Sequence, residues 1–135
     1  MNIETLTWLL RLAGLICVGL VIANFVAPGR LGYAQSLAGA ATLVRQIFYV
    51  HCAYIVLIIA SLAVLCLGWP GLLLDPGMGQ VVSGFFAFLW GSRVVVQLTY
   101  YDPEHRARER FWDVFFLLVF LTLAAVFAVA ALADR

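Results

Sequence analysis

The sequence predicts an all-α membrane protein in which four transmembrane helices form a compact up-and-down bundle. Hydrophobic residues make up 65% of the 135 residues, charged residues only 11%, and the mean hydropathy is +1.05. A soluble domain is closer to half apolar and a quarter charged, so this chain could not cover a water-facing surface. Four long apolar runs account for the excess. They are continuous, whereas the strands of a membrane barrel alternate over about 10 residues.

The first apolar run covers approximately residues 6–26 and stops at the breaker pair Pro28-Gly29. Its start has no basic region, so we expect a retained helix and not a cleaved signal peptide. The alanine-rich segment 29–42 is moderately polar. It fits either a short interfacial helix or a cytoplasmic extension of the second span.

The second run covers approximately residues 43–69 and is ended by Pro70-Gly71. The third covers approximately 80–101, ended by Asp102-Pro103, and the fourth approximately 111–132. Each run is near or above the ~20 residues that cross ~30 Å of hydrocarbon as a helix. The four spans predict a single transmembrane domain over residues 1–135.

The arginines predict the orientation of the helices. The connection between the first and second spans carries Arg30 and Arg45, and the connection between the third and fourth carries Arg106, Arg108 and Arg110. These two connections would lie on the same side of the bilayer. The opposite side has only Arg11 and the terminal Arg135. Because cytoplasmic loops are enriched in basic residues, we expect a multi-pass protein of a bacterial inner (cytoplasmic) membrane with both termini outside.

Polar side chains within the spans gather toward the predicted cytoplasmic end. The third span carries a stripe at helical spacing: Phe86, Trp90, Arg93, Gln97, Tyr100 and Glu104. A neighbouring face carries Ser83, Ala87 and Gly91, a small-residue pattern that favours close helix packing. Arg93 lies about 12 Å along the helix axis from Tyr101, and an unpaired arginine at such depth costs roughly 2.5–3.5 kcal/mol.

Two interpretations of these polar residues remain open. In the first, a ligand is held by the cytoplasm-facing cluster of Arg45, His51, Arg93, Gln97 and Tyr100. In the second, Arg93 pairs with Asp113 of the fourth span and only fixes the register of the helices.

Several function classes lack support in the sequence. A net charge of +1 argues against nucleic acid as a partner. No catalytic or metal-binding motif is recognisable, which favours a non-enzymatic role without excluding catalysis. We predict no cofactor. A haem held within one chain is improbable because only His51 lies in a span, although two copies could each donate that histidine.

Three functions remain as expectations. Short loops and small-residue faces favour an accessory or structural subunit of a larger membrane complex. The polar cluster favours binding or catalysis on an anionic amphiphile, such as a lipid head group or a quinone. A small oligomeric transporter or channel ranks last, because the outer half has few polar side chains. The expected partners are membrane lipids and either further copies of the chain or other membrane subunits.

Overall fold

The computed structural model describes residues 2–133 and confirms the predicted fold of four long apolar helices. These are α1 (Ile3–Arg30), α3 (Thr42–Gly68), α5 (Met78–Thr99) and α7 (Arg110–Leu132). Each is long and apolar enough to cross a membrane, and the described residues form no strand. The bounds of α3, α5 and α7 lie within two residues of those predicted from hydropathy.

Three short helices connect the long ones: α2 (Tyr33–Ser36), α4 (Pro70–Leu73) and α6 (Pro103–Arg108). Of the two alternatives for segment 29–42, the structure has the short helix. The start of α6 follows local chemistry, since the carboxylate of Asp102 accepts a hydrogen bond from the backbone N–H of Glu104 at 3.2 Å. Pro103 then occupies the first turn, where a missing N–H costs nothing.

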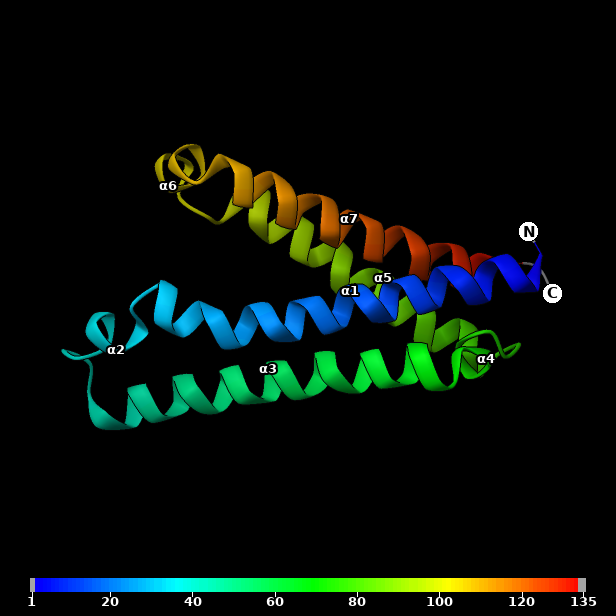
Figure 1. The fold of residues 1–135 in the computed structure, drawn as a ribbon, viewed down its shortest axis with the longest axis horizontal. Coiled ribbons are helices and arrows are strands. Elements are labelled where there is room, and N and C mark those ends of the chain that lie inside the picture. The colour runs from blue at the N-terminus through cyan, green and yellow to red at the C-terminus, as the bar shows by residue number, and fades with distance from the viewer. Residues whose placement is uncertain (1, 134–135) are drawn as a thin grey trace.

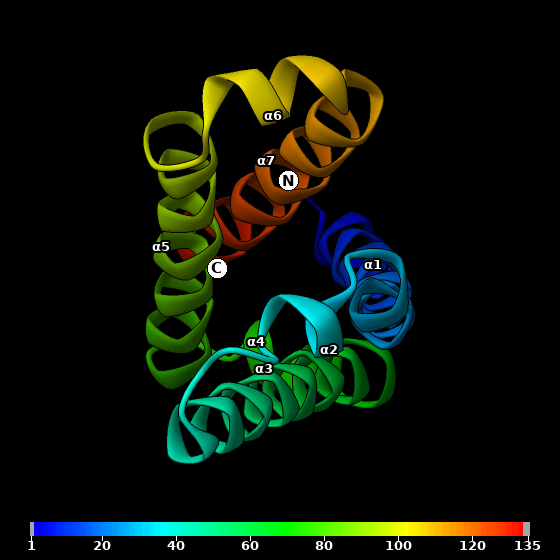
Figure 2. The same cartoon turned by 90° about the vertical axis from the view of Figure 1, so that its left-hand side faces the viewer.

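The long helices pack as two antiparallel pairs, α1 with α3 and α5 with α7, and the pairs are joined mainly by α1 against α7. Figure 1 shows that the two pairs meet near α4 and diverge toward α2 and α6. The first residues of α1 and the last of α7 lie at the closed end. Viewed from the open end, α6 bridges the ends of α5 and α7, and α2 lies near the ends of α1 and α3 (Figure 2).

The closed end holds most of the core. Its fully buried apolar side chains include Leu6, Leu10, Cys17, Cys66, Leu73, Leu123 and Phe127. Helix α4 approaches α5 closely there, because a methyl group at Gly79 would lie 2.5 Å from the carbonyl oxygen of Leu72. The hydroxyl of Ser83 donates to the carbonyl of Leu73 at 3.0 Å and satisfies a buried polar group at the same contact.

One predicted boundary is wrong: α1 does not end before Pro28 but continues to Arg30. Proline in the last turn removes only one backbone hydrogen bond, and the N–H of Leu31 still bonds the carbonyl of Ala27 at 2.8 Å. The 28 residues of α1 span about 42 Å, compared with about 33 Å for the 22 residues of α5. The extra turn keeps Arg30 on the helix, at the open end of the molecule.

Candidate functional site

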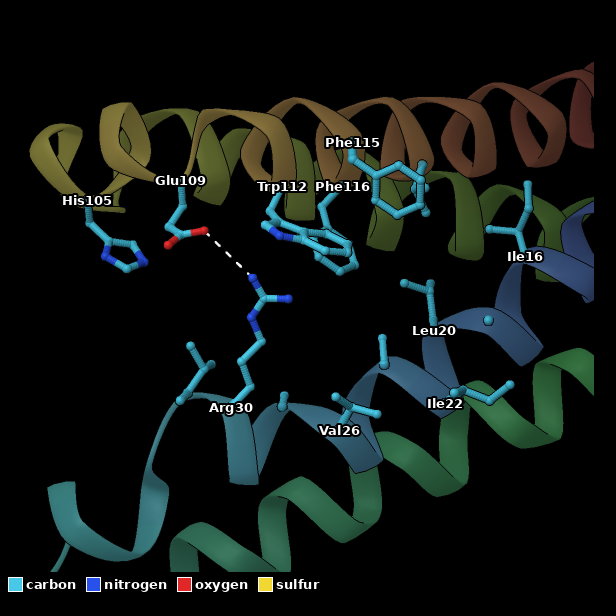
Figure 3. A pocket seen from close by; sticks show the side chains of 15 residues that line it. Ile16, Leu20, Ile22, Val26, Arg30, His105, Glu109, Trp112, Phe115 and Phe116 are labelled. Carbon is cyan, nitrogen blue, oxygen red and sulfur yellow. Dashed lines mark ion pairs between the residues drawn. The ribbon is translucent and has the colours of Figure 1, made fainter.

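A cleft of about 750 Å³ separates α1 from α7 at the open end of the molecule. Most of the side chains along it are apolar (Figure 3). They are Ile16, Leu20, Ile22, Ala23, Val26, Ala27 and Leu31 on one wall and Trp112, Phe115, Phe116 and Val119 on the other, with Gly19 also contributing.

Helical spacing explains why the two walls leave space between them. Gly19, Ala23 and Ala27 follow one another at steps of four and place small residues along one face of α1. The facing side of α7 carries the aromatic residues Trp112 and Phe116 at the same step. A methyl group built on Gly19 would meet no atom within 4 Å, so the cleft is open at this point.

Polar side chains stand at the mouth of the cleft, which we define by Arg30, His105 and Glu109. Figure 3 shows Arg30 and Glu109 pointing toward one another from opposite walls. Their closest nitrogen and oxygen atoms are 3.9 Å apart, and both side chains are about half exposed. The Arg30 guanidinium also lies 4.8 Å from the ring centre of Trp112, within reach of a cation–π contact.

A second polar cluster, formed by Arg106, Asp113 and Gln97, ties the ends of α5, α6 and α7 together. The Arg106 guanidinium donates two hydrogen bonds of 3.0 Å to the carboxylate of Asp113. The Gln97 amide donates to the Asp113 carboxylate at 2.9 Å and to its backbone carbonyl at 2.7 Å. The hydrogen bonds to Asp113 raise the pKa of Arg106 above its usual value.

The predicted pair of Arg93 with Asp113 is not found, because Asp113 has Arg106 as its partner. Within residues 2–133 Arg93 makes no ion pair. Its guanidinium instead lies 5.4 Å from the ring centre of Tyr101 and 5.3 Å from that of Phe120. Aromatic faces therefore provide part of the stabilisation that an anion was expected to provide.

The five residues predicted to bind a ligand are not gathered at the cleft. Gln97 is buried and bonded to Asp113, whereas Tyr100 is 82% exposed. Arg45 and His51 lie on the first half of α3, where the His51 Nδ1 is 2.8 Å from the carbonyl oxygen of Ile47. None of the five, Arg93 included, lines the space between α1 and α7.

Sequence reasoning missed the residues that do stand at the mouth. Arg30 was used only for orientation, because Pro28 was expected to end the helix before it. Trp112 and Glu109 were not among the residues predicted to bind a ligand. The four-residue spacing of Gly19, Ala23 and Ala27 was an available signal. A stripe of small residues marks a helix face that either packs closely against a neighbouring helix or leaves open space beside it.

No family model, curated protein or solved structure matches this chain. Among residues 2–133 no group of three or more His, Cys, Asp or Glu side chains is placed to hold a metal ion. The chemical evidence on function is therefore the cleft itself: apolar walls, two opposite charges at the mouth, and an aromatic ring beside the cation.

Proposed function

We propose that this protein binds a membrane amphiphile in the cleft between α1 and α7. The apolar tail lies along the two walls, and an anionic group of the head contacts Arg30. The observation that carries the proposal is the coincidence of an apolar cleft of about 750 Å³ with a half-exposed arginine at its mouth. Ligand sites commonly enclose about 300–1,000 Å³, with few polar groups that fix orientation.

The position of Arg30 supports this assignment. As the last residue of a helix longer than the hydrocarbon is thick, it stands at the level where lipid head groups lie. Its planar guanidinium suits the oxygens of a phosphate or carboxylate. Its side chain makes no closer polar contact than the 3.9 Å approach to Glu109 within residues 2–133, so its donors are available.

We also propose that the open end faces the cytoplasm of a bacterial cell and that both termini lie outside. Helix α6 and the residues beside it hold Arg106, Arg108 and Arg110, and α1 adds Arg30 at the same end. The closed end has Arg11 as its arginine among residues 2–133. This imbalance follows the enrichment of basic residues in cytoplasmic loops.

A cysteine in place of Ala107 tests the orientation. Ala107 is exposed on α6, so Ala107→Cys is expected to react with a membrane-impermeant maleimide only after the inner face is opened. The native cysteines are replaced by serine or alanine beforehand, and a cysteine in the Asp75–Gly77 turn at the other end is the matched control. Labelling of position 107 in intact cells would invert the orientation.

Photo-crosslinking tests where a tail lies. The protein is reconstituted with a phospholipid that carries a diazirine on one acyl chain, and the labelled peptides are mapped by mass spectrometry. We expect the yield over residues 16–27 and 112–119 to exceed that over residues 50–58 of α3, where Val50, Leu57 and Ile58 are exposed on the surface. Excess unreactive lipid should remove the difference. Equal yields over the two regions would contradict the proposal.

A role as an accessory subunit is the second candidate, and one observation favours it. The buried residues of α3 are Leu62, Ala63 and Cys66, all in its last third. The first part of this helix packs weakly within the chain although it carries Arg45, His51 and Tyr54. A second membrane chain on this face would give these polar groups partners that lipid does not offer.

A further inference from the structure

The mouth of the cleft carries both a cation and an anion, and this pairing restricts the head group that fits there. We infer that the amphiphile is a phospholipid whose head combines a phosphate with a primary ammonium, as in phosphatidylethanolamine. The phosphate contacts Arg30 and the ammonium contacts Glu109. This inference rests on the proposed function, because it names the class of amphiphile that the cleft takes.

The geometry of the two charged side chains leaves both of them able to accept a ligand. Their separation of 3.9 Å is longer than a direct hydrogen bond, and each side chain is about half exposed, 54% for Arg30 and 48% for Glu109. A guanidinium offers five N–H donors, and a carboxylate accepts at about four positions. A head group can therefore contact both without burying an unpaired charge.

Charge complementarity favours a head with both signs over a head with one. A purely anionic head on Arg30 would bring its charge close to the Glu109 carboxylate, and like charges at this range repel. A purely cationic head on Glu109 would meet Arg30 in the same way. A phosphate with a nearby ammonium matches each side chain with the opposite charge, so both contacts are favourable.

The surroundings also favour a primary ammonium over a quaternary one. Quaternary ammonium groups are recognised by the faces of aromatic rings. The ring of Trp112 already has the Arg30 guanidinium at 4.8 Å, so this face is taken. Glu109 offers hydrogen-bond acceptors, which a primary ammonium can use through its three N–H groups and a trimethylated nitrogen cannot.

Competition among three lipids with identical acyl chains tests the inference. The purified full chain is incubated with equimolar phosphatidylethanolamine, phosphatidylglycerol and phosphatidylcholine, and retained lipids are counted by native mass spectrometry. We expect phosphatidylethanolamine to be retained roughly fivefold over each of the others, a modest factor because the contacts are half exposed to solvent.

Two charge variants refine the result. Glu109→Gln is expected to remove the preference over phosphatidylglycerol, because Arg30 then faces the head without a competing carboxylate. Glu104→Gln is the matched control, an exposed glutamate on α6 outside the cleft, and should keep the wild-type preference. An unchanged preference in Glu109→Gln would overturn the assigned contact.

The outcomes for the unmodified protein separate the two proposals. Preferential retention of phosphatidylglycerol, or equal retention of phosphatidylcholine, would overturn the head-group inference and leave an amphiphile site in place. Retention of none of the three, together with no excess crosslinking in the cleft, would overturn the proposed function itself. Because these outcomes concern the wild-type chain, they do not depend on the folding of any variant.

Discussion

Arg106→Gln is expected to lower the melting temperature in detergent by roughly 5 °C or more. Arg106 donates both of its 3.0 Å hydrogen bonds to Asp113, whose side chain is only 14% exposed. Removing the guanidinium leaves a largely buried carboxylate with the Gln97 amide as its remaining side-chain partner. An uncompensated charge at such a position is strongly destabilising, more so than the loss of an exposed pair.

Two further variants make this prediction specific. Arg108→Gln removes an exposed arginine of the same helix that makes no ion pair within the described part of the chain, so its melting temperature should stay near that of the wild type. Combining Arg106→Gln with Asp113→Asn removes both charges and should recover part of the loss. Equal melting temperatures for Arg106→Gln and Arg108→Gln would contradict the role assigned to the pair.

Hydropathy and breaker residues predicted most of the fold. A lipid-exposed span must bond its own backbone groups, so a continuous apolar run of sufficient length has few alternatives to a helix. This constraint explains why the bounds of α3, α5 and α7 were predicted within two residues. Pro28 misled the prediction for α1, because proline ends a helix in its interior but is tolerated in its last turn.

The cleft could not be predicted in the same way, because it depends on how the helix pairs diverge. Periodicity places Gly19, Ala23 and Ala27 on one face of α1, but it does not say whether that face meets a neighbour or an opening. The small residue Ser83 was read from the same kind of pattern, and it does meet a neighbour, α4. Whether a small-residue face packs on a neighbouring helix or borders a cleft depends on the crossing angles of whole helices, which periodicity does not give.

The partners of charged side chains were also beyond the sequence. Arg93 and Asp113 were paired because both were expected in the cytoplasmic half of the bundle, but Asp113 lies level with Gln97, one helical turn from Arg93 along α5. Arg106 lies seven residues before Asp113, and the short helix α6 folds it back onto that carboxylate. The turn between α6 and α7 therefore determines which arginine pairs with the Asp113 carboxylate. The depth of the residues in the spans does not determine it.

Gly19→Phe is expected to remove the bound amphiphile. Gly19 lies on the wall of the cleft, and no atom lies within 4 Å of the position of an added methyl group. Because the position of the added Cβ is free, a phenyl group there is expected to project into the space that we propose for the tail. We expect retention of phospholipid to fall by about tenfold or more, which corresponds to about 1.4 kcal/mol.

Gly91→Phe is the matched control for this substitution. Gly91 is a helical glycine of α5 that also has open space around it but does not line the cleft. Both changes replace glycine within a helix by the same residue, so their effects on helix propensity are similar. Any difference between the two variants in lipid retention therefore reports on the cleft.

Native mass spectrometry of the wild type, Gly19→Phe and Gly91→Phe, purified side by side from the same membranes, tests the central claim most directly. The wild type and Gly91→Phe are expected to carry one phospholipid mass per chain, and Gly19→Phe is expected to retain about a tenth of that amount or less. Equal lipid retention by all three proteins would contradict the claim that the cleft between α1 and α7 is a binding site.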